Sequence, residues 1–123
     1  MDRLSRLEQR PLPDGGTLLV ARTFGQRLLG LAGLRAMPAD CALLIPGCES
    51  VHTAWMRFSI DAAFLDSSGA VVRVAEGVRP WRMAWCREAA AVVETRAGQA
   101  AALGFRVSAS RSPAGPRPAA RRA

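Results

Sequence analysis

The chain has 123 residues and half of them are hydrophobic, which suffices for one globular domain with its own core. The net charge is +7, and all 17 of the Lys or Arg residues are arginines. No run of about 18 apolar residues occurs, which excludes a membrane-spanning helix.

The positive charge is unevenly distributed along the chain. Residues 109–123 carry four arginines and no acid, whereas the rest carries 13 arginines against 10 acids. This pattern predicts a nearly balanced body and a solvated basic tail. The body lacks Tyr, and its aromatic residues do not alternate with a basic stripe, so we do not expect it to bind nucleic acid. Contact with nucleic acid through the tail is a weaker alternative.

The first predicted elements are a strand and a short helix. Residues 1–16 are polar, with charges and prolines where a signal peptide needs an apolar block, so we expect an N-terminal extension and a cytoplasmic location. Residues 17–22 are β-rich and predict the first strand. Apolar side chains at helical spacing then predict a helix over residues 23–34, with Thr23 as its N-cap.

The middle of the chain predicts strands. The apolar run at residues 41–46 ends at a Pro-Gly pair and predicts a buried strand. Residues 51–74 form the longest β-like region, with a hairpin turn at residues 66–69.

The last predicted elements follow a loop in which Trp81 and Trp85 flank Met83; with Trp55, these tryptophans either fill the core or line a ligand groove, and exposed aromatics in a loop hint at a binding surface. Residues 88–94 predict a strand, and residues 97–103 predict a short helix closed by Gly104. Residues 105–109 predict a final strand. From residue 110 the sequence lacks large apolar side chains, so residues 110–123 are expected to be a disordered Arg/Pro/Ala tail.

These elements predict a mostly β (α+β) fold. Several short strands with hairpin turns and two short helices favour a small antiparallel β-sandwich or barrel. The globular domain is expected to span residues 17–109.

A concentration of ionisable side chains in apolar strands predicts a compact polar site. His52, Arg57 and Asp61 lie among large apolar residues, and Glu94 lies in a later strand. Burying any of these charges requires a nearby partner. We therefore expect the four to lie together, either as a structural cluster with an ion pair or as a functional site with Trp55 or Trp81 at its edge.

Several motifs resemble domain-of-unknown-function family 192, a prokaryotic family. They are the strand-to-helix segment ARTFGQRLLGLAGL, the strand CALLIPGC, the run VHTAWMRFSIDAAFLD with the hairpin DSSGAVVRV, and the closing VVETRAGQAAALGF. The likeness covers roughly residues 17–107, with Ser59 where the family usually has proline.

The resemblance implies a mostly β sandwich or barrel with short helices, and it implies no particular activity. The residues that match the family pattern are Met56, Arg57, Asp61, Glu94, Ala97 and Gly98, with His52 and Thr53 as features of one branch.

Three kinds of chemistry are possible alternatives. Cys48 and His52 with another cysteine could bind zinc or form a Cys-His nucleophile, but the odd number of thiols and the missing Cys-x-x-Cys spacing predict reduced, metal-free cysteines. Asp61 and Glu94 could act as the carboxylate pair of a small hydrolase. They could instead receive Arg57 or cap backbone donors.

The sequence thus favours a small, soluble, non-catalytic module that binds a small molecule or a protein at this polar site, with the hydrolase as the alternative. We expect no cofactor and no metal. The predicted ligand-binding residues are His52, Trp55, Met56, Arg57, Asp61, Trp81 and Glu94.

Overall fold

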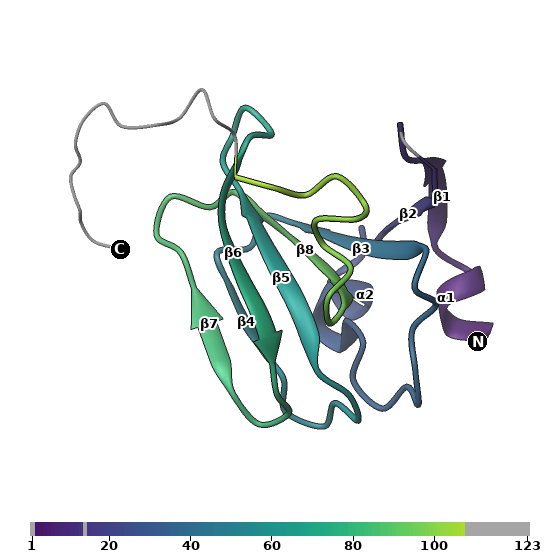
Figure 1. Ribbon diagram of the computed structural model, residues 1–123. Helices are drawn as coiled ribbons and strands as arrows, with labels where there is room; N and C mark the ends of the chain where they lie inside the picture. The colour runs from purple at the N-terminus through teal and green to yellow at the C-terminus, as the bar shows by residue number, and fades with distance from the viewer. Residues whose placement is uncertain (1, 14, 108–123) are drawn as a thin grey trace, which may run out of the picture.

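The computed structural model describes residues 2–13 and 15–107, which form a small, mostly β domain (Figure 1). A six-stranded sheet has the order β1-β2-β3-β8-β5-β6, and β4 pairs with β7 as a separate two-stranded ribbon. The elements are α1 Asp2–Ser5, β1 Glu8–Pro11, β2 Thr17–Val20, α2 Phe24–Leu29, β3 Cys41–Pro46, β4 Ser50–His52, β5 Ile60–Leu65, β6 Val71–Val78, β7 Met83–Trp85 and β8 Ala91–Arg96.

The mostly β prediction is confirmed, but the sheet is neither purely antiparallel nor a closed barrel. β1 and β6 lie at its two edges, and β2 pairs with β3 in parallel. A parallel pair needs a long crossover, which here contains α2. Thr23 caps α2 in a capping box with Gln26, and the helix ends where Gly30 adopts a φ of 49°. The helix is therefore shorter than the predicted residues 23–34.

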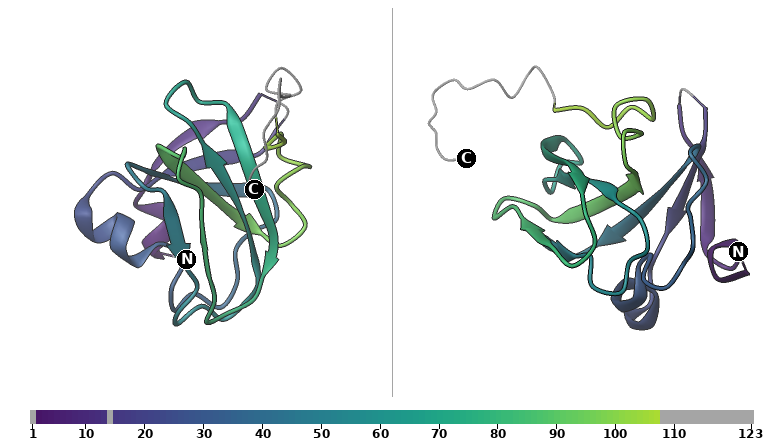
Figure 2. Two further views of the ribbon diagram at one scale, coloured as in Figure 1. Left: turned by 90° about the vertical axis from the view of Figure 1, so that its left-hand side faces the viewer. Right: turned by 60° about the horizontal axis from the view of Figure 1, so that its bottom comes forward.

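Two layers cover opposite faces of the sheet. On the face we call the helix face, Leu31 and Met37 from the crossover pack on Leu43 and Ile45 of β3. The β4–β7 ribbon covers the other end of the same face, where Val51, Ala84 and Cys86 pack on Ala62, Phe64 and Val92. Figure 2 shows α2 on one side of the sheet and the yellow-green segment after β8 on the other. That segment supplies Leu103 and Phe105 to the core of the opposite face.

Two expectations for the chain ends differ from the structure. Residues 97–104 form hydrogen-bonded turns rather than the predicted helix 97–103, and residues 105–107 form no strand. The predicted extension contains α1 and β1, and Leu4 and Leu7 from it are buried in the core. The predicted basic tail lies outside the described residues. Among the helices of residues 2–13 and 15–107, none has the length and apolar content needed to cross a membrane.

Candidate functional site

Asp61 is a structural clamp. Its side chain is 2% exposed on the face opposite the helix face, where Asp61 pairs with Thr95 of β8. Oδ1 accepts a hydrogen bond from Gly77 N at 2.9 Å, and Oδ2 accepts from Gly98 N at 3.0 Å and Ala100 N at 3.1 Å. One carboxylate thus ties β6 and the turn after β8 to the sheet, which confirms the interpretation of Asp61 as a cap for backbone donors.

Glu94 is a buried carboxyl group, 5% exposed. It lies opposite Leu43 and Ala62 in the centre of the sheet, on the helix face. Its Oε1 has no hydrogen-bond partner among the described residues. Burial raises the pKa of Glu94 from 4.5 to about 7, because an apolar environment disfavours the charged form.

The prediction that Asp61 and Glu94 share one site is wrong. Both lie in the paired strands β5 and β8, but Asp61 is opposite Thr95 while Glu94 is opposite Ala62. Side chains of successive strand residues point to opposite faces, so the two carboxyl groups lie on opposite sides of the sheet. Arg57 is exposed, and within the described residues it forms no ion pair with either of them.

The remaining polar candidates are also apart from the buried carboxyl groups. His52 is exposed on β4, whereas Met56 is buried in the core. The Cys48 thiol donates to Ser50 O at 2.8 Å rather than to His52. Burial raises the pKa of the Cys86 thiol, so it is a poor nucleophile. In the part of the chain that the structure describes, no group of three or more His, Cys, Asp or Glu could hold a metal ion.

The exposed side of the β4–β7 ribbon carries large apolar side chains. Met83 lies opposite His52 and Trp85 lies opposite Ser50, and Met83 and Trp85 are both 63% exposed. In the turns next to the ribbon, Trp55 is 70% and Trp81 is 58% exposed. The ring centroids of Trp55 and Trp81 are 4.9 Å apart in an edge-to-face contact. We call Trp55, Trp81, Met83 and Trp85 the tryptophan surface.

Thr53 holds the two turns of the tryptophan surface together. It is fully buried; its Oγ1 donates to Arg79 O at 2.7 Å and accepts from Arg82 N at 2.7 Å. Its backbone carbonyl accepts from Trp81 N at 3.0 Å and from Met56 N at 3.1 Å. These bonds fix both turns around one buried side chain.

The backbone at Trp55 and Trp81 is strained. They are the only non-glycine residues with positive φ in the described chain, at 67° and 64°. This region is unfavourable for a bulky residue and favours glycine. Gly33 N donates to Trp55 O at 2.9 Å and helps to hold the first of these turns.

The sequence pointed to the three tryptophans as ligand contacts or core residues, and the pair that flanks Met83 hinted at a binding surface. It did not indicate that Thr53 holds this surface together. The segment RPWRMAWCR carries a signal for the surface, because Trp81, Met83 and Trp85 occur at strand spacing. On the same spacing Ala84 faces inward, so the small residue between the large ones marks the buried side.

A family comparison gives the chain its identity. The model of family DUF192, described as "Uncharacterized ACR", matches residues 12–110. The chain belongs to this family. Comparison with curated proteins finds no match.

Two solved structures resemble this DUF192 chain. One is a protein of unknown function from Novosphingobium aromaticivorans, with a TM-score of 0.64 and 18% identity, covering 80% of this chain and 77% of that chain. The other is described as a putative transcription regulator from Sinorhizobium meliloti, with a TM-score of 0.65 and 26% identity, covering 81% of this chain and 84% of that chain. The first likeness shows a shared fold.

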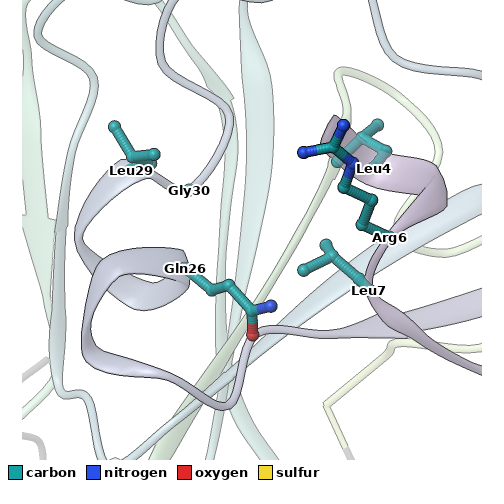
Figure 3. Close-up of a pocket in the computed structure, with 6 residues that line it drawn as sticks. All are labelled: Leu4, Arg6, Leu7, Gln26, Leu29 and Gly30. Carbon is teal, nitrogen blue, oxygen red and sulfur yellow. The ribbon is translucent and has the colours of Figure 1, made fainter. Parts of the chain in front are cut away.

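A small hollow lies between α1 and α2 of the DUF192 chain (Figure 3). Its volume is about 180 Å³, and it is lined by Leu4, Arg6, Leu7, Gln26, Leu29 and Gly30. None of the predicted site residues lines it. Glu94 lies behind its wall, because Oε1 is 3.5 Å from the position that a Cβ on Gly30 would occupy.

Proposed function

We propose that this DUF192 chain is a non-catalytic binding module whose partner contacts the tryptophan surface. The observation that carries the proposal is that all three tryptophans of the chain are more than half exposed. Tryptophan is highly buried on average, and a contiguous exposed apolar patch marks an interaction site. Trp, Met and Arg are also enriched in interfaces, and buried Trp is a frequent binding hot spot.

The strained turns support the same proposal. A positive φ at a residue with a large side chain costs on the order of 1–3 kcal/mol, and glycine would avoid that cost. At 70% exposure Trp55 recovers little of it by burial. Strain of this kind clusters at functional sites, where the surrounding structure holds it in place.

The hydrolase alternative lacks a suitable pair of carboxylates. Glycoside hydrolysis needs two carboxyl groups on either side of one scissile bond, at most about 10 Å apart across an open site. Here Asp61 and Glu94 are both buried and point to opposite faces of the sheet. Asp61 also uses both carboxylate oxygens for backbone hydrogen bonds.

A thermal-shift screen with peptides, saccharides, nucleotides and lipids tests the proposal. A ligand of the surface raises the melting temperature of the wild-type chain. It should fail to do so with the double variant Trp81→Ala/Trp85→Ala. The matched control is Val107→Ala, another exposed apolar residue, in the segment on the opposite face of the sheet. Ligands that stabilise the double variant as strongly as the wild type would show that binding lies elsewhere.

A further inference from the structure

We infer that the tryptophan surface docks on an anionic lipid surface, an inference that rests on the proposed binding function. Its first basis is charge. The two segments that form the surface, residues 50–58 and 79–87, contain four arginines and a histidine, and the exposed acids Glu49 and Glu88 directly flank them at the Trp85 end. The exposed arginines are Arg57, Arg79, Arg82 and Arg87. An apolar surface with an excess of positive charge, four arginines against two flanking acids, complements a partner that combines apolar and anionic groups.

The second basis is the chemistry of the exposed side chains. Tryptophan prefers the boundary between lipid headgroups and acyl chains, because its ring is apolar and its N–H still finds a hydrogen-bond acceptor there. Arginine can lie along such a boundary and donate to lipid phosphates. An apolar anchor combined with basic residues provides the two contributions that stable peripheral binding requires.

The third basis is position. The connection between β6 and β7, which carries Trp81, lies at the lower end of the molecule in Figure 1, where β4 also ends. Trp55 and Trp81 therefore occupy turns at one end of the domain. This arrangement lets both rings enter a lipid surface while the six-stranded sheet stays in water.

The arrangement of the side chains favours lipid over single-stranded nucleic acid. Base stacking uses open faces of aromatic rings. Trp55 and Trp81 instead meet edge to face at 4.9 Å and form one apolar block. Between Trp81 and Trp85 the exposed side chain is Met83, which has no ring to stack on. Insertion into a lipid boundary makes no such demand on ring geometry.

Vesicle co-sedimentation of the full chain tests the inference. The probes are vesicles of phosphatidylcholine alone and vesicles that also contain phosphatidylglycerol. We expect binding to the anionic vesicles, with a blue shift of tryptophan emission, and weaker binding as salt is added. Trp81→Ala/Trp85→Ala and Arg79→Ala/Arg82→Ala should each lower the partition coefficient by about tenfold or more.

The double variant Arg6→Ala/Arg106→Ala is the matched control. It removes the same charge at exposed positions outside the two segments, so it should bind nearly as well as the wild type. An equal loss of binding in this control would overturn the inference, because net charge rather than the surface would then govern binding. The inference would also be overturned if anionic vesicles left the tryptophan emission unchanged. The same holds if oligonucleotides or acidic proteins bound the tryptophan surface and vesicles did not. A ligand from the thermal-shift screen that needs Trp81 and Trp85 would still support the proposed function in that case.

Discussion

Asp61 and Glu94 are buried carboxyl groups in neighbouring strands, and their surroundings differ. Asp61 accepts three backbone hydrogen bonds, whereas Glu94 faces apolar residues and the backbone at Gly30. Asp61 therefore serves as an acceptor for three backbone donors, whereas burial among apolar groups destabilises the charged form of Glu94. Conservative amide substitutions should consequently change stability in opposite directions.

Glu94→Gln should stabilise the protein above neutral pH. The folded pKa of about 7 lies above the value of 4.5 expected in the unfolded chain. Below pH 4.5 the Glu94 carboxyl group is protonated in both the folded and the unfolded chain, so its burial carries no cost of ionisation. As the pH rises to about 7, the unfolded chain releases the proton first, and the free energy of unfolding falls by roughly 3 kcal/mol.

Urea denaturation at pH 5 and pH 8 measures this effect. Glu94→Gln should have nearly wild-type stability at pH 5 and should be more stable by a few kcal/mol at pH 8. No titratable side chain lies opposite Glu94 on β3 or β5, where Leu43 and Ala62 face it, or at Gly30. A variant less stable than the wild type at pH 8 would show that the Glu94 carboxylate has a partner.

Asp61→Asn should destabilise the protein by about 2–4 kcal/mol at pH 7. An amide has one acceptor oxygen, so its NH2 group would face at least one N–H of Gly77, Gly98 or Ala100. Urea denaturation gives the free energy of unfolding, and hydrogen exchange at Gly98 and Ala100 locates the loss. Wild-type stability with unchanged exchange would contradict the clamp role of Asp61.

At the scale of elements, Thr53 couples the end of β4 to the turn that precedes β7. Thr53→Val keeps the shape but leaves Arg79 O and Arg82 N without the Thr53 hydroxyl. We expect a loss of about 1–3 kcal/mol and a mobile Trp81. Thr53→Ser is the control, because it keeps the hydroxyl and should keep most of the stability. If valine and serine have the same effect in urea denaturation, the hydroxyl does not hold the turns.

Strands were predictable from sequence where apolar runs end at strong turn signals. The predicted strand 41–46 has the bounds of β3, and the turn after β5 forms as expected, with Asp66 Oδ1 accepting from Ser68 N and Ala70 N. β1 was missed because all four of its residues are exposed, and it gains its structure by pairing with β2. The turns at residues 97–104 are stabilised by Asp61, a contact distant in sequence.

The candidate site was less predictable than the fold, because strand register decides which residues meet. The sequence placed Asp61 and Glu94 in strands, but a shift of one residue in register moves a side chain to the other face. Trp55 and Trp81 have positive φ angles, which no local sequence pattern predicts for tryptophan. The sequence nevertheless indicated that candidate site residues concentrate in residues 48–66.

At the scale of the whole molecule, the sheet is the support for the tryptophan surface. Val51 and Ala84 attach the ribbon to the core through Phe64 and Val92. Arg73 of β6 adds a hydrogen bond to Trp85 O, and its guanidinium lies 5.6 Å from the centroid of the Phe64 ring. These contacts fix the face of the β4–β7 ribbon that packs on the sheet. The opposite face of the ribbon remains exposed to a partner.

The central claim is that all three tryptophans of the chain are exposed on the tryptophan surface. Intrinsic fluorescence tests this claim most directly. The chain has three tryptophans and no tyrosine, so emission excited in the near ultraviolet reports almost entirely on this surface. For the free, full-length protein the account predicts emission and acrylamide quenching close to those of tryptophan in water, at all protein concentrations. Emission that is already blue-shifted and protected from acrylamide in the free protein would contradict the account.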